Sequence, residues 1–282
     1  MSSAPAVDSH RPRRRWLWLF APQRIGRKQG DDGGYAATPA DVGLAAQDVW
    51  LESKSGTRLH GWFVPVHERA PAVLVVHGWG GSAARMLPFA PEFHRAGFHA
   101  FFLDVRNHGH SEPDRFVSMP RFADDLEVAL DWLEQHPEVT TIGVIGHSVG
   151  AGASILSASR GRSPDALVSV AAPADPGDLM RELMANLPRP VLGAVLAVVQ
   201  RIIGARFEDF APRHRIPLVD SPLLLVHGDA DAVVPVASMH ELAAAQPRAE
   251  VLLVAGGTHS DLERFAPHLP DVTGFLTRHL SR

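Results

Sequence analysis

The chain of 282 residues contains no cysteine. Disulfide bonds, thiolate metal sites and a cysteine nucleophile are therefore excluded. The absence leaves the cellular compartment open, because many exported proteins also lack cysteine.

Long hydrophobic runs and a strong excess of one charge are missing as well. The longest apolar run, residues 191–199, is far shorter than the roughly 18 residues that a membrane span needs. The formal net charge is only −4, and the one basic cluster lies at the N-terminus, which argues against a nucleic-acid partner. With 45% hydrophobic and 21% charged residues, the chain is expected to be a globular protein with one large core.

Residues 1–44 are rich in Gly, Pro, Asp and Arg and have no periodicity, so we expect a tail and lead-in. Four arginines between Arg11 and Arg15 precede an aromatic stretch from Trp16 to Phe20. This pattern is compatible with a tail that packs on the domain, with an interfacial membrane anchor, or with a short signal peptide. We expect a cytoplasmic protein, with weak membrane-surface contact through this segment and export left open.

Strand-like and helix-like segments alternate through the rest of the chain. A hairpin is expected from residues 48–52 and 59–64, and unbroken apolar runs typical of buried parallel strands follow. The strands are expected at residues 72–77, 99–104, 141–146, 166–171, 222–227 and 250–254. The helices are expected at residues 83–96, 121–136, 149–160, 238–245 and 262–280. This alternation predicts an α/β fold with a mostly parallel, doubly wound sheet and an antiparallel N-terminal edge.

The alternation is interrupted between Ala171 and Pro222 by two apolar helical patterns. We interpret residues 173–220 as a small helical cap inserted into a single domain, residues 45–282. The apolar positions on these helices either line an acyl pocket or serve only in helix packing. They are Leu183, Met184, Leu187, Leu192 and Leu196.

The candidate nucleophile is Ser148, in the sequence Gly146-His147-Ser148-Val149-Gly150. It lies between a strand-like run and a helix-like run, which is the context that the Gly-x-Ser-x-Gly motif requires. The flanking glycines allow neighbouring backbones to approach, and the helix N-terminus offers unpaired N–H groups to a developing oxyanion.

A serine hydroxyl needs a base, and the base needs an orienting acid. His259 follows the last strand and therefore lies at the same sheet edge as Ser148. His147 is expected to point elsewhere, and His227 to brace a turn. Of the two aspartates after the strand at 222–227, Asp229 is expected to bond the turn, and Asp231 is the preferred acid.

An oxyanion hole is expected at the glycine-rich turn from His77 to Ser82, which follows the first parallel strand. The backbone N–H groups of Trp79 and Val149 are the natural pair of donors.

Taken with the segment from Asp104 to Ser111, these motifs resemble the α/β-hydrolase family over about residues 46–279. The similarity is to small-capped, esterase-like or lipase-like serine hydrolases. It implies a catalytic triad of Ser148, Asp231 and His259, with oxyanion donors Trp79 and Val149. Asn107 stands where many relatives have glycine, so the loop around it is expected to differ slightly.

The resemblance implies hydrolysis of a small-molecule carboxylic ester through an acyl-enzyme, without metal or organic cofactor. A thioesterase or an amide hydrolase would use the same triad, and a lyase of the same fold is a more distant alternative. A serine at position 148 argues against dehalogenases and epoxide hydrolases, which carry aspartate there. The oligomeric state stays open.

Overall fold

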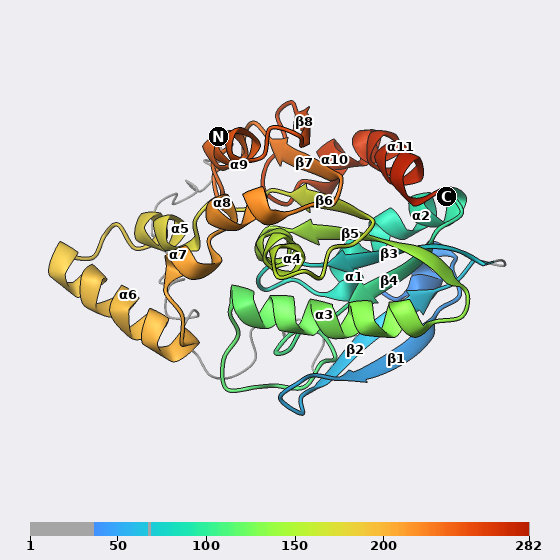
Figure 1. The fold of residues 1–282 in the computed structure, drawn as a ribbon, viewed down its shortest axis with the longest axis horizontal. Coiled ribbons are helices and arrows are strands. Elements are labelled where there is room, and N and C mark those ends of the chain that lie inside the picture. The colour runs from blue at the N-terminus through green and yellow to red at the C-terminus, as the bar shows by residue number, and fades with distance from the viewer. Residues whose placement is uncertain (1–36, 67–68, 282) are drawn as a thin grey trace, which may run out of the picture.

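The fold is described from a computed structural model, which covers residues 37–66 and 69–281 (Figure 1). Within them, eight strands form one sheet in the order β1-β2-β4-β3-β5-β6-β7-β8. The β1–β2 and β2–β4 pairs are antiparallel, and all other pairs are parallel. The strands are β1 (Gln47–Glu52), β2 (Arg58–Val64), β3 (Ala70–Val76), β4 (His99–Leu103), β5 (Val139–His147), β6 (Ala166–Val170), β7 (Leu223–Gly228) and β8 (Glu250–Val254).

Helices cover both faces of this sheet, so the mostly parallel α/β architecture expected from the sequence is confirmed. The α-helices are α1 (Ala83–Met86), α2 (Ala90–Arg95), α3 (Met119–Gln135), α4 (Val149–Ser159), α5 (Pro176–Leu183), α6 (Arg189–Ile203), α7 (Phe207–Phe210), α8 (Pro212–Arg215), α9 (Ala237–Ala245), α10 (Leu262–Phe265) and α11 (Leu269–Leu280). The short 3-10 helices are η2 (Pro39–Val42), η3 (Leu87–Phe89), η4 (Ile216–Leu218) and η5 (Ala266–His268).

Two apolar cores lie on opposite faces of the sheet. One contains the inner faces of α3, α4 and α9. The other contains α1, α2 and α11. Helix α3 shows how the sequence builds such a layer: Phe122, Leu126, Leu130 and Leu133 recur on one helical face, and all four are buried.

Two helices expected to be continuous are interrupted, and proline is the physical reason. The segment expected at 83–96 is divided into α1, η3 and α2, with Pro88 and Pro91 in the first turns of the second and third pieces. The segment expected at 262–280 is divided into α10, η5 and α11, with Pro267 and Pro270 in the same positions. Proline has no N–H to donate to the preceding turn, so it starts a helix and does not continue one.

The segment expected to be a cap contains α5, α6, α7, α8 and η4. Helix α6 extends away from the sheet in Figure 1. It buries Leu196 and Val199 and exposes Val191, Val198 and Ile202. Its role as a cap stays a prediction.

Part of the N-terminal lead-in is also described. Val42 and Leu44 pack against the core formed by α1, α2 and α11, so residues 37–44 lie on the domain. The arginine and tryptophan segment, residues 11–20, lies outside the described residues. Among those that are described, no helix is long and apolar enough to cross a membrane.

Candidate active site

Ser148 occupies a sharp turn between β5 and α4. Its backbone has φ 54° and ψ −117°, a strained conformation for a residue with a side chain. The turn is tight on both sides: a Cβ atom at Gly146 would lie 2.5 Å from the Gly150 carbonyl oxygen, and one at Gly150 would lie 2.5 Å from the His77 carbonyl oxygen. Only glycine allows these approaches, and they hold the serine at the carboxyl edge of the sheet.

His259 and Asp231 lie beside Ser148 in one hydrogen-bonded chain. The Ser148 Oγ is 3.0 Å from His259 Nε2, and His259 Nδ1 is 2.7 Å from Asp231 Oδ2. A carboxylate only accepts, so Nδ1 carries the proton and Nε2 is free to accept the serine proton. The three residues come from loops after β5, β7 and β8, as the chain order implies.

Asp231 is buried, and the carboxylate oxygen that does not face His259 also accepts hydrogen bonds. Its Oδ1 accepts hydrogen bonds from the Val233 and Val234 amides at 2.8 and 2.9 Å. Burial alone would raise the pKa of Asp231, but hydrogen bonds from His227, His259 and Val234 outweigh burial and hold the pKa well below its usual range. The carboxylate therefore stays ionised and can orient the imidazole across the physiological pH range.

His227 and Asp229 support this loop, as expected from the sequence. The His227 Nε2 donates to the Val234 carbonyl oxygen at 2.8 Å, which braces the turn that contains Asp231. The Asp229 carboxylate accepts from the Gly256 amide at 2.6 Å.

The turn after β3 lies directly against the nucleophile. A Cβ atom at Gly78 would be 3.0 Å from Ser148 Cβ, so this backbone passes very close to the serine. The amide N–H groups of Trp79 and Val149 donate to no acceptor in the described part of the chain. They are thus available as oxyanion donors, in the two positions that the motif requires.

Two buried histidines hold this turn in place, and the sequence did not indicate their role. His77 Nδ1 donates to the Gly78 carbonyl oxygen at 2.8 Å. The Gly80 amide donates to His108 Nε2 at 3.1 Å, while His108 Nδ1 donates to the Arg106 carbonyl oxygen at 2.9 Å. Burial lowers the pKa of His77 and lowers the pKa of His108 to about 4, so both rings are neutral. His77 directly follows β3 and His108 lies in the loop after β4, and these positions beyond the carboxyl ends of strands are a signal that could have identified them.

His147 does not point away from the site, contrary to the expectation. Its Nε2 donates to the backbone oxygen of His259 at 2.7 Å, and the two rings lie 5.0 Å apart. Burial, with the nearby His259, lowers the pKa of His147 to about 4. The neutral ring therefore fixes the loop that carries His259, which is a reason for histidine at this position in the motif.

The backbone conformation of Asn107, in the loop after β4, shows why asparagine can replace glycine there. Its φ is 64°, in the left-handed region that glycine adopts most easily. Asparagine tolerates this region better than most residues, so it can stand at a position where many relatives have glycine.

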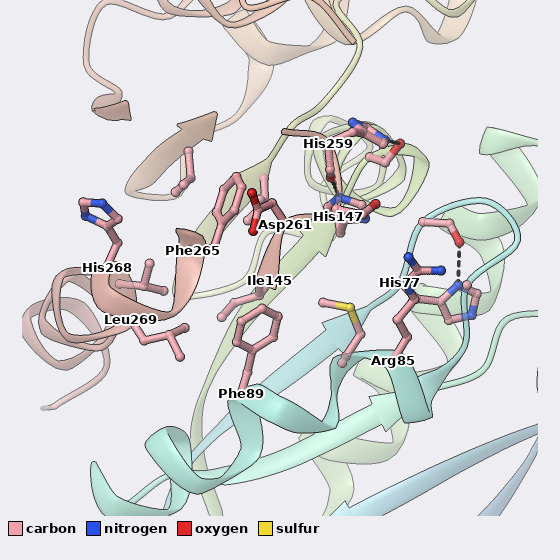
Figure 2. A pocket seen from close by; sticks show the side chains of 18 of the residues that line it. His77, Arg85, Phe89, Ile145, His147, His259, Asp261, Phe265, His268 and Leu269 are labelled. Carbon is pink, nitrogen blue, oxygen red and sulfur yellow. Dashed lines mark hydrogen bonds between the residues drawn. The ribbon is translucent and has the colours of Figure 1, made fainter. Parts of the chain in front are cut away.

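A cavity of about 970 Å³, including its space open to solvent, adjoins Ser148 and His259 (Figure 2). Its apolar wall comes mostly from the helices after β3 and after β8, with one side chain each from β5, β6 and β7. The apolar side chains in it are Met86, Phe89, Phe93, Ile145, Val170, Val226, Phe265, Leu269 and Val272. The five residues offered as an acyl pocket on the cap helices do not line this cavity. Met184 and Leu196 among them are instead buried in the core of α3 and α4.

Within residues 37–66 and 69–281, no cluster of three or more His, Asp or Glu side chains could hold a metal ion. The absence of a cofactor stays a prediction. The oxygen and nitrogen atoms gathered at Ser148 are suited to proton transfer and nucleophilic attack.

Comparison with known proteins identifies the family. The family described as serine aminopeptidase, S33, matches residues 67–213, more than half of the chain. The chain belongs to this family of α/β-hydrolases. An uncharacterised protein of Mycobacterium tuberculosis is 30% identical over 236 residues, which is 82% of this chain and 78% of that protein. The α/β-hydrolase domain-containing protein WAV2 of Arabidopsis thaliana is 26% identical over 80% of this chain and 76% of its own.

Solved structures of the same fold include esterases. An esterase of Pyrococcus furiosus has a TM-score of 0.69 and 23% identity, over 88% of this chain and 96% of that one. The protein Est1E of Butyrivibrio proteoclasticus, solved with ferulic acid bound, has a TM-score of 0.67 and 18% identity, over 83% of this chain and all of that one. At these identities the likeness concerns the fold.

Proposed function

We propose that this α/β-hydrolase cleaves carboxylic esters through an acyl-enzyme on Ser148. The observation that carries the proposal is the continuous hydrogen-bonded chain from Ser148 to His259 to Asp231, which opens onto an apolar cavity. An apolar wall beside the nucleophile suits the hydrocarbon part of a small or medium acyl group.

The geometry supports the following steps. The Ser148 Oγ attacks the ester carbonyl carbon while His259 Nε2 takes its proton, and the carbonyl oxygen becomes an oxyanion near the Trp79 and Val149 amides. The C–O bond to the alcohol then breaks, and the alcohol leaves with the proton from Nε2. Water, deprotonated by His259, attacks the acyl-enzyme; the acid leaves, and Ser148 regains its proton. The ionised Asp231 stabilises the imidazolium in both halves.

Labelling by a fluorophosphonate, followed by mass spectrometry, tests the nucleophile directly. The wild-type protein is expected to gain one covalent adduct on Ser148, and the Ser148→Ala variant none. The same variant should lose about 10⁴- to 10⁶-fold in kcat on p-nitrophenyl esters.

Ser159→Ala is a matched control on the same helix. The Ser159 Oγ donates to the Leu156 carbonyl oxygen and does not line the cavity, so this variant should label and turn over like the wild type. Retention of more than a tenth of the wild-type rate in Ser148→Ala would contradict the mechanism.

Amide hydrolysis is the second candidate, because the matching family is described as a serine aminopeptidase. The triad geometry is the same for esters, thioesters and amides. A panel of one ester, one thioester and one anilide with the same acyl group separates them by kcat/KM, with a clear ester preference expected. Fluorophosphonate labelling without turnover on the panel would instead favour a lyase.

A further inference from the structure

The guanidinium side chain of Arg85, on α1, lines the cavity that contains Ser148. Figure 2 shows Arg85 extending from α1 beside His77 on the side of the cavity that also carries His147. Its positive charge contributes to the lowered pKa of His147, together with the larger effects of burial and of His259. The Arg85 side chain is exposed to solvent and borders the same cavity as Ser148 and His259.

Among the residues that the structure describes, the Arg85 side chain finds no partner, unlike the other charged or ionisable residues of the wall. The Asp261 carboxylate accepts from the Arg264 amide at 3.1 Å, at the start of α10. His268 Nδ1 lies 3.5 Å from Asp271 Oδ2. The guanidinium of Arg85, by contrast, forms no hydrogen bond or ion pair with any residue in the described ranges. Its N–H donors are available to a molecule in the cavity.

We propose that Arg85 binds a carboxylate carried by the ester substrate, so that the enzyme prefers carboxylate-bearing esters to neutral esters of the same shape. The inference rests on the proposed esterase function and names its substrate class. A guanidinium presents five N–H donors in a planar fork that fits a carboxylate with two parallel hydrogen bonds. The apolar wall beside it, which includes Met86 and Phe89, would hold the carbon chain between the ester and the carboxylate.

The test compares pairs of esters. In each pair, one ester carries a carboxylate at the position where the other carries a methyl group. In the acyl arm, monoethyl adipate is compared with ethyl hexanoate. In the alcohol arm, the butanoate ester of 4-hydroxybenzoate is compared with that of 4-methylphenol. The ratio of kcat/KM for the charged ester over the neutral one is measured for the wild type and for Arg85→Gln, Arg85→Lys and Arg95→Gln.

The ratio is expected to fall roughly ten- to hundredfold in Arg85→Gln in one arm, which identifies the end of the substrate that carries the carboxylate. Arg85→Lys should keep part of the preference, because it retains the charge but loses the planar fork. Arg95 is a matched control: it lies on α2, pairs with Glu92 and does not line the cavity, so its variant should match the wild type. The wild-type ratio should also decrease with salt, since Arg85 is exposed.

The outcomes that overturn the inference are distinct from those that overturn the proposed function. An equal loss on charged and neutral esters in Arg85→Gln would assign Arg85 a general role in the site and contradict carboxylate recognition. An unchanged ratio in both arms would contradict it as well. A wild-type protein that cleaves none of the four esters would contradict the esterase function itself.

Discussion

Two helical regions follow the carboxyl ends of parallel strands of the sheet, and they contribute very differently to the site. The helices after β3 and β8, which are α1 to α2 and α10 to α11, supply most of the apolar cavity wall. Helices α5 and α6, which follow β6, supply none of it. Instead, α6 extends from the body and exposes Val191, Val198 and Ile202.

The difference follows from chain connectivity. The wall helices directly continue the two loops that carry Trp79 and His259, so they begin close to Ser148. Helix α5 begins after a loop that carries none of the site residues. An apolar stripe at helical spacing therefore shows that a helix buries one face, but it does not show which cavity that face borders. The following predictions test this division of the molecule.

The largest effect is expected from Gly78→Ala, in the turn that leads into α1, compared with a glycine substitution on α6. In Gly78→Ala, the new Cβ would lie 2.9 Å from His147 Nδ1 and 3.0 Å from Ser148 Cβ, so the turn that carries the Trp79 amide must shift. Displacing an oxyanion donor should lower kcat by about 10²-fold or more. In Gly193→Ala, on α6, the new Cβ meets no atom within 4 Å, and kcat should stay at the wild-type value. Equal kcat values for the two variants would contradict the conclusion that the turn before α1 shapes the site and that α6 does not.

The second-largest effect is expected in the preference of the enzyme for esters of different acyl-chain length. Leu269→Trp places a larger side chain in the cavity wall and should lower kcat/KM for octanoate esters roughly tenfold relative to acetate esters. Leu192→Trp, on α6, should leave the chain-length profile unchanged. A changed profile for Leu192→Trp would show that the cap helices border the acyl group during turnover.

A smaller effect is expected in the pH dependence of stability. The pKa of His108 is about 4 in the folded protein and 6.5 in the unfolded chain. Between these values the unfolded state binds more protons, so the stabilisation that is complete above pH 6.5 decreases as the pH falls toward 4. Urea unfolding of His108→Gln should give a slope shallower by up to about 1.4 kcal/mol per pH unit in this range.

His240→Gln is the control for this measurement, because His240 is exposed on α9. Its pH slope should equal that of the wild type. Parallel slopes for His108→Gln and the wild type would show that His108 is not the group that takes up the proton.

The smallest effect is expected from Gly193→Ala in thermal or urea unfolding. An alanine in the interior of an exposed helix should raise the free energy of unfolding by roughly 0.5–1 kcal/mol. Gly161→Ala also meets no neighbour, but Gly161 has φ 90°, where a side chain is strained, and this variant should be destabilised. If both variants shift stability in the same direction, backbone conformation is not what decides the effect.

The strands, and the sheet edge at which Ser148, Asp231 and His259 lie together, could be predicted from the sequence, because both depend on local patterns and on chain order. The unbroken apolar run of β3 and the glycines around Ser148 carry their structural meaning within a few residues. The chain order of Ser148, Asp231 and His259 then places all three at one edge of a parallel sheet.

The cavity and the supporting histidines could not be predicted in the same way. The cavity lies between Met86 and Leu269, which are far apart in the sequence, and its shape depends on how two interrupted helices pack. The bond from His147 to the His259 backbone also joins distant segments. The roles of such residues depend on tertiary contacts that no local pattern encodes.

The glycines on either side of Ser148 bear on how this protein could be altered in the laboratory. A side chain at position 146 would meet the Gly150 backbone, and one at position 150 would meet the His77 backbone. A saturation library would therefore lose folded protein at these two positions, whereas alanine at position 148 would cost turnover. Attempts to evolve a new substrate range should leave residues 146–150 intact and randomise the helical wall, for example at Phe265 and Leu269.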